Sequence, residues 1–256
     1  MATIPFKRII ARTLFPEGAV RTVLWGPCRG IRYRIFPGYG WSYLYGGWER
    51  PQVRLMQKFV QQGSVAYDLG ANYGMHTLLM NRLVGTTGRV FAFEPSSEVF
   101  SALQGQLTLN PGHAVTPVNR AVSQETGWAT FDPSSDRATG ALSDAGSVKV
   151  AVVSLDDFVF QEGNPAPHFM KIDVEGAESA ALRGAGKVLE KYRPSMMIEL
   201  HNPVEDRAVG AILKDLDYDV FRITDDSPVQ NLTSGWPDRA GMWGTVYCPG
   251  RTQSTR

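Results

Sequence analysis

The stretch Val65-Ala66-Tyr67-Asp68-Leu69-Gly70-Ala71-Asn72-Tyr73-Gly74 decides the fold of this chain, and Val90-Phe91-Ala92-Phe93-Glu94-Pro95 follows it. The apolar start predicts a buried strand, and the two glycines let the next loop approach a ligand where a Cβ atom would intrude. Glu94 ends the following strand about 20 residues further on, where a carboxylate can accept hydrogen bonds from both hydroxyls of a ribose. Together these features predict a nucleoside-binding site.

From Val65 onward, short β-rich runs alternate with helical patterns, which predicts a parallel sheet with helices on its faces. We expect strands at residues 65–68, 89–94, 115–119, 169–173, 195–200, 218–223 and 243–248, and helices at 75–83, 97–109, 177–192 and 205–216. Residues 127–158 break this alternation. Strands expected at 128–131 and 148–153 predict a β-rich insertion over the ligand-bearing edge, and a further strand is expected at 31–36.

Length and composition are those of an ordinary globular protein. The chain has 256 residues, of which 43% are hydrophobic and 20% charged, and its formal net charge is +1, so bulk charge gives no reason to expect a nucleic-acid partner. We expect one domain, with residues 1–60 as an N-terminal extension or lid and 61–256 as the ligand-binding domain. Two solitary cysteines and the lack of a signal-like or membrane-spanning run favour a cytoplasmic location.

Basic and apolar residues interleave in residues 7–15. This pattern suits a docking helix, and it also leaves open a peripheral helix on a membrane surface. The sequence does not indicate an oligomeric state.

The glycine loop favours one nucleoside cofactor over others. Its spacing is Gly70-x-x-x-Gly74 rather than G-x-G-x-x-G, and it has no lysine of the kind that holds phosphates. A ligand without a pyrophosphate is therefore favoured, such as S-adenosylmethionine. Asp68 would then help to hold the ammonium group, and Glu94 would hold the ribose.

Several motifs follow one another along the chain. They are Asp68 to Gly74 with Thr77-Leu78, Ala92-Phe93-Glu94-Pro95, and Phe169-Met170-Lys171-Ile172-Asp173-Val174-Glu175-Gly176-Ala177-Glu178 followed by Ile198-Glu199-Leu200-His201. In this order they resemble the FkbM family of S-adenosylmethionine-dependent methyltransferases. The resemblance implies a Rossmann-like α/β methyltransferase sandwich, with a mostly parallel seven-stranded sheet in which one late strand is antiparallel. It also implies O-methylation of a hydroxyl on a sugar, glycoconjugate precursor or polyketide-like product. Cofactor contacts are expected from Asp68, Gly70, Asn72, Gly74, Thr77, Glu94 and Pro95.

Asp173 and Glu175 follow one expected strand, and Glu199 and His201 follow the next, so these four residues are the candidate catalytic group. A neutral His201 suits a general base that removes the hydroxyl proton. The same four side chains could instead ligate a divalent metal. Structural roles also remain open: His201 as a loop histidine bonded to backbone, and Glu199 as a buried partner of Lys171. Glu178 fits a favourable charge on a helix dipole.

The aromatic residues Trp41, Tyr43, Tyr45 and Trp48 precede the cofactor motifs and would either cover a small-molecule or glycan acceptor or belong to the core. Three other functions stay open. They are N-methylation of a small amine or peptide, a nicotinamide-dependent oxidoreductase, and a nucleoside-binding protein without catalysis.

Overall fold

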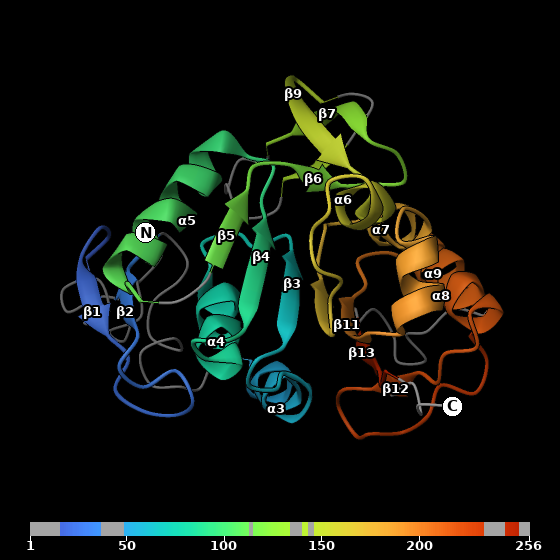
Figure 1. Cartoon of the computed structure of the whole chain (residues 1–256), viewed down its shortest axis with the longest axis horizontal. Helices are drawn as coiled ribbons and strands as arrows, with labels where there is room; N and C mark the ends of the chain where they lie inside the picture. The colour runs from blue at the N-terminus through green and yellow to red at the C-terminus, as the bar shows by residue number, and fades with distance from the viewer. Residues whose placement is uncertain are drawn as a thin grey trace, which may run out of the picture.

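The computed structural model describes residues 16–36, 49–112, 115–133, 140–142, 146–232 and 244–250. At its centre lies a seven-stranded sheet in the order β12-β13-β11-β10-β3-β4-β5 (Figure 1). Only β13 runs antiparallel to its neighbours, β11 and β12. This confirms the predicted sheet with one late antiparallel strand. The strands are β3 (Val65–Leu69), β4 (Arg89–Phe93), β5 (Val115–Val118), β10 (Phe169–Ile172), β11 (Ser195–Glu199), β12 (Phe221–Arg222) and β13 (Thr245–Cys248).

Two hydrophobic cores lie on opposite faces of this sheet because side chains alternate along each strand. Tyr67 and Leu69 of β3 belong to one core, and Ala66 belongs to the other. The first core is covered by α6 (Leu155–Phe160), α7 (Glu178–Arg183), α8 (Gly186–Tyr192) and α9 (Pro203–Asp215). The second is covered by α3 (Arg50–Phe59), α4 (Met75–Val84), α5 (Ser97–Leu109) and the hairpin of β1 (Val20–Thr22) and β2 (Arg32–Arg34). The result is a three-layer sandwich.

The helix expected at 177–192 is in fact two helices, α7 and α8, which separate at Gly184. A Cβ atom on Gly184 would lie 2.1 Å from the carbonyl oxygen of Ser123, so the chain passes too close to the loop after β6 for a larger residue. Leu182, Ala185 and Leu189 are nevertheless all fully buried. The apolar spacing therefore continues across the break and hides it in the sequence.

The predicted insertion forms its own four-stranded sheet in the order β6-β9-β7-β8. Its strands are β6 (Ala121–Val122), β7 (Gly127–Asp132), β8 (Ala141–Leu142) and β9 (Val148–Val153). Ala121, Phe131, Val150 and Val152 form a small buried cluster on one side of it. Figure 1 shows this small sheet as a separate unit at the top of the view.

The N-terminal hairpin is tied to the main sandwich through α5. The backbone N–H of Arg34 donates to Gln106 Oε1 at 2.8 Å, and Gln106 Nε2 donates to the carbonyl of Arg34 at 3.0 Å.

Helix α3 was not predicted from the sequence, and it buries Val53, Leu55 and Met56. Within the described ranges, the helices are too short or too polar to cross a membrane.

Candidate active site

The loop after β3 forms a tight cradle at the C-terminal edge of the sheet. Gly70, Asn72 and Gly74 have positive φ angles of 77°, 50° and 85°, a region that glycine and asparagine tolerate best. A Cβ atom on Gly70 would lie 1.8 Å from the carbonyl oxygen of Asp173, and one on Gly74 would lie 2.4 Å from Leu103 Cδ1. The backbone contact therefore requires glycine at position 70, whereas at Gly74 the contact is the end of a leucine side chain and the positive φ angle is the stronger constraint.

Glu94 follows β4 and points its carboxylate at this loop. Oε2 accepts the backbone N–H of Asn72 at 3.0 Å, and Oε1 accepts that of Ser96 at 2.9 Å. Burial raises the pKa of Glu94 to about 7, although the two N–H donors act in the opposite direction. Each carboxylate oxygen keeps further acceptor capacity. When ionised, Glu94 can therefore accept hydrogen bonds from a pair of ligand hydroxyls.

A pocket opens between the glycine loop and the small insertion sheet. The main sheet supplies polar groups at the strand ends, and the insertion supplies an apolar wall. The lining includes Gly70, Asn72, Glu94, Pro95, Asp173 and Glu175 from the strand ends, and Ala121, Val122, Phe131, Pro133, Gly140 and Leu142 from the insertion. An adenosyl group combines a flat apolar base with a polar ribose, and this lining offers surfaces for both.

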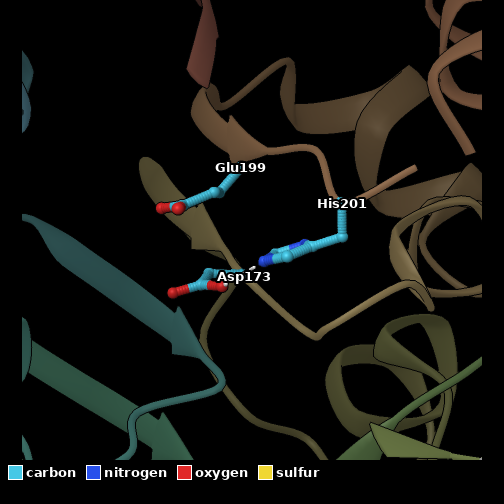
Figure 2. A group of neighbouring side chains, drawn as sticks. All are labelled: Asp173, Glu199 and His201. Carbon is cyan, nitrogen blue, oxygen red and sulfur yellow. Dashed lines mark ion pairs between the residues drawn. The ribbon is translucent and has the colours of Figure 1, made fainter. Parts of the chain in front are cut away.

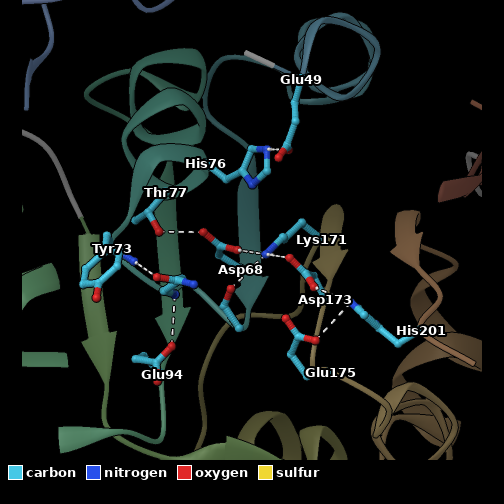
Figure 3. Close-up of polar contacts among 12 residues, drawn as sticks. Glu49, Asp68, Tyr73, His76, Thr77, Glu94, Lys171, Asp173, Glu175 and His201 are labelled. Atoms are coloured by element: carbon cyan, nitrogen blue, oxygen red, sulfur yellow. Dashed lines mark hydrogen bonds and ion pairs between the residues drawn. The ribbon is translucent and has the colours of Figure 1, made fainter. Parts of the chain in front are cut away.

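Asp68 lies beneath the loop at the centre of a buried network (Figure 3). Its Oδ2 accepts the hydroxyl proton of Thr77 at 2.6 Å, and its Oδ1 lies 3.5 Å from Lys171 Nζ. The same ammonium donates to the carbonyl of Gly70 at 2.8 Å and lies 2.9 Å from Asp173 Oδ2. Burial alone would lower the pKa of Lys171, but the charges of Asp173 and Asp68 raise it above its usual value. Lys171 is therefore a permanent cation between two carboxylates.

A second cluster adjoins the pocket where β10 and β11 end (Figure 2). His201 Nδ1 lies 2.8 Å from Glu178 Oε1. His201 Nε2 lies 3.4 Å from both Asp173 Oδ1 and Glu175 Oε2. One possible ligand atom from each of Asp173, Glu199 and His201 lies within 4.8 Å of the others. The four predicted catalytic residues are thus brought together, and Asp173 and Glu175 also line the pocket.

The carboxylates around His201 determine its charge. Burial alone would lower the pKa of His201, but the hydrogen bond to Glu178 and the charges of Asp173 and Glu175 raise it to about 9. These contacts favour the protonated imidazole while no cation is bound beside it, and the role of His201 as a neutral base stays a prediction. Burial raises the pKa of Glu199 to about 7, and the charge of Asp173 acts in the same direction. Lys171 keeps the pKa of Asp173 below its usual value in spite of burial.

The residues predicted to bind the cofactor fall into two groups. Gly70, Asn72, Glu94 and Pro95 line the pocket. Asp68 and Thr77 are fully buried and bonded to each other, and Gly74 packs against Leu103. In the structure the Asp68 carboxylate bonds Thr77 and lies beside Lys171 beneath the loop, and its contact with a ligand ammonium stays a prediction.

Three residues of this region were missed or assigned differently. Glu178 is fully buried against His201 and is more than a charge near a helix start. His76 Nε2 lies 3.1 Å from Glu49 Oε2, a pair that no spacing rule indicates because the two residues are far apart in the chain. Lys171 pairs with Asp68 and Asp173 rather than with Glu199. The aromatic residues Trp41, Tyr43, Tyr45 and Trp48 lie outside the described residues.

The strand order, the late antiparallel strand and the glycine loop facing an acid on the next strand define a methyltransferase of the Rossmann-like class. Comparison with known proteins agrees, because the model of the methyltransferase FkbM domain matches residues 68–220. The chain belongs to the FkbM methyltransferase family and is an S-adenosylmethionine-dependent methyltransferase. This finding replaces the oxidoreductase and non-catalytic alternatives.

Among curated proteins, the chain is 30% identical over 169 residues to the hexuronic acid methyltransferase AglP of Haloferax volcanii, covering 65% of this chain and 68% of AglP. Two solved structures share the fold at lower identity. A crystal structure of an FkbM methyltransferase from Methylobacillus flagellatus has a TM-score of 0.50 and 20% identity, and the match covers 72% of this chain but only 43% of that one. The crystal structure of a protein from Clostridium thermocellum that is assigned as an rRNA methylase has a TM-score of 0.52 and 16% identity. The match covers 77% of this chain and 91% of that one.

Proposed function

We propose that this enzyme transfers a methyl group from S-adenosylmethionine to a hydroxyl of a sugar, and that a hexuronic acid residue is the preferred acceptor. The observation that carries the proposal is the continuity of the two sites, since Asp173 and Glu175 belong both to the nucleoside pocket and to the cluster around His201. The relative that methylates a hexuronic acid supports the acceptor class.

The residues of the pocket fit the donor. Gly70 leaves no room for a side chain at the loop, and the Glu94 carboxylate faces the pocket with acceptor capacity for ribose hydroxyls. The wall that contains Phe131 and Leu142 is apolar, as an adenine ring requires. When bound, S-adenosylmethionine supplies a methyl group attached to a positively charged sulfur. The negative charges of Asp173 and Glu175 favour that charge beside them.

The acceptor must lie on the far side of the methyl group from the sulfur, so alignment accounts for a large part of the acceleration. The acceptor oxygen forms a bond to the methyl carbon while the carbon–sulfur bond breaks, and the electron pair of that bond stays on sulfur. The hydroxyl proton passes to a carboxylate. Glu175 Oε2 and Asp173 Oδ1 are the oxygens that face the pocket and the cluster together.

The aromatic residues Trp41, Tyr43, Tyr45 and Trp48 directly precede Glu49, whose carboxylate approaches His76 near this cluster. We propose that they stack on the acceptor sugar, as aromatic faces commonly do. Residues 1–60 would then act as an extension of the methyltransferase domain, which spans residues 61–256. A cytoplasmic location stays a prediction.

The test incubates the protein with S-adenosylmethionine labelled in the methyl group and a matched set of glycosides. The set contains a hexuronic acid, the neutral hexose of the same configuration and the corresponding amino sugar. We expect label on the hexuronic acid in an alkali-stable methyl ether, and little on the neutral hexose. Label in an alkali-labile ester would show that the carboxylate is the acceptor, and label on the amino sugar nitrogen would support the N-methyltransferase alternative; either would overturn the proposal.

A variant and its matched control test whether the cluster around His201 takes part in methyl transfer. Glu175→Gln removes a pocket-facing carboxylate and should lower kcat by about 100-fold, the usual size of a proton-transfer contribution. Glu190→Gln changes an exposed glutamate on α8 that is not among the residues lining the pocket, and it should leave kcat unchanged.

A further inference from the structure

The cluster at the ends of β10 and β11 contains a set of metal-ligand atoms. Asp173 follows β10, Glu199 is the last residue of β11, and His201 comes two residues later. One ligand atom from each lies within 4.8 Å of the others (Figure 2). Two carboxylates with one imidazole form a mainly oxygen set, which suits magnesium or manganese.

Glu178 orients the imidazole in the way expected of a metal ligand. It is fully buried, and its Oε1 accepts the backbone N–H of Gly176 at 3.0 Å and lies 2.8 Å from His201 Nδ1. An N–H at Nδ1 therefore donates its hydrogen bond to Glu178, and Nε2 points toward Asp173 and Glu175. Histidines that bind metals usually donate their other ring N–H to a carboxylate in this manner. Glu178 Oε2 is also buried and has no hydrogen-bond partner within the described parts of the chain.

The distribution of charge leaves the ligand atoms available. Lys171 is occupied by Asp68, the carbonyl of Gly70 and Oδ2 of Asp173, which leaves Oδ1 of Asp173 directed at His201. Among the described residues, no hydrogen bond or ion pair reaches the side chain of Glu199. Nε2 of His201 lies 3.4 Å from Asp173 Oδ1 and from Glu175 Oε2, and a cation bound there would take the place of the proton on Nε2.

We propose that Asp173, Glu199 and His201 bind one divalent cation and that the acceptor hydroxyl occupies an open position on it. The cation lowers the pKa of the hydroxyl, and the released proton passes to the neighbouring carboxylate of Glu175. A hexuronic acid gains a second contact, because its carboxylate can bind the same cation in a site otherwise lined by acids. The role of the hydroxyl rests on the proposed function, whereas cation binding itself does not.

The test measures Mn²⁺ binding to the full chain by electron paramagnetic resonance, without donor or acceptor. We expect saturable binding of one Mn²⁺ per chain. Glu199→Gln removes a ligand and Glu178→Gln removes the support of His201, and each should weaken binding by about 10-fold to 100-fold. Glu190→Gln should bind as the wild type does. S-adenosylhomocysteine affinity, measured for each variant, shows that the donor pocket is still folded.

Two results would overturn the cation site: no saturable Mn²⁺ binding, or equal binding by Glu199→Gln and the wild type. Undiminished methyl ether formation in excess chelator would overturn its part in the reaction. The proposed function fails by a different result, in which Mn²⁺ binds but no sugar hydroxyl is methylated. Failure of one proposal is therefore distinguishable from failure of the other.

Discussion

The close approach of Gly70 to the end of β10 gives a quantitative prediction for Gly70→Ala. An alanine Cβ would lie 1.8 Å from the carbonyl oxygen of Asp173, which is backbone and cannot rotate away. The glycine also has a φ angle of 77°. The substitution thus imposes a left-handed conformation on alanine and forces the cradle loop away from the neighbouring strand.

The two costs can be separated with Gly163→Ala. Gly163 has a φ angle of 74°, and a Cβ atom there would meet nothing within 4 Å. A left-handed alanine costs about 1–2 kcal/mol, and overpacking adds about 1–3 kcal/mol. We expect Gly163→Ala to lose only the first amount and Gly70→Ala to lose about 2–5 kcal/mol of unfolding free energy.

Urea denaturation at pH 7 measures the free energy of unfolding for both variants, and calorimetric titration measures their affinity for S-adenosylhomocysteine. Gly70→Ala should bind this product at least about tenfold more weakly, which corresponds to about 1.4 kcal/mol, and Gly163→Ala should bind it as the wild type does. Equal stability of the two variants together with unchanged affinity of Gly70→Ala would refute the reasoning that the close approach shapes the donor loop.

Three further predictions concern the donor pocket and the buried network. Burial raises the pKa of Glu94 to about 7, and ribose binding needs the ionised carboxylate. The affinity for S-adenosylhomocysteine should therefore rise by up to about tenfold per pH unit below about pH 7 and level off above it. In Glu94→Gln this pH dependence should vanish. Lys171→Met leaves the buried carboxylate of Asp68 and the half-buried one of Asp173 without their cation. It should cost about 3–5 kcal/mol in urea unfolding, whereas a loss under about 1 kcal/mol would contradict the network. Phe131→Ala removes a buried ring from the pocket wall, and it should lower the free energy of unfolding by about 3 kcal/mol and weaken donor binding. The control is Trp128→Ala, on the same strand but at a residue that is 67% exposed. It should lower the free energy of unfolding by about 1 kcal/mol or less and leave donor affinity unchanged.

Much of the sheet could be predicted from local pattern, because apolar runs such as those of β3 and β4 are buried on both faces and have distinct ends. The division of the helix after β10 could not. At the division, Gly184 packs against the carbonyl oxygen of Ser123, a contact between segments remote in sequence. Helix α3 was missed because glutamate is not a usual N-cap residue, although Pro51 in the first turn is a helix-start signal. The Glu49 side chain makes no capping hydrogen bond and approaches His76 instead.

In the candidate site, strand ends were sufficient to predict which groups would meet. Asp173, Glu175, Glu199 and His201 follow adjacent parallel strands, so topology brings them together. The protonation states of these side chains were not predictable, because they depend on the buried carboxylate of Glu178 and on the direction in which the Lys171 side chain points. For the same reason, Asp68 looked like a ligand contact by position, although its side chain turns beneath the loop to Thr77.

The ammonium of Lys171 links the donor loop to the acceptor edge of the site. It holds the carbonyl of Gly70 in the donor loop and a carboxylate oxygen of Asp173 at the acceptor edge with one charge. Any ligand that withdraws Asp173 from this contact changes the free energy of the loop as well. By linkage, the factor by which acceptor binding alters donor affinity must equal the factor by which the donor alters acceptor affinity. Through Lys171, an acceptor that changes the Asp173 contact would therefore also change the affinity of the loop for the donor.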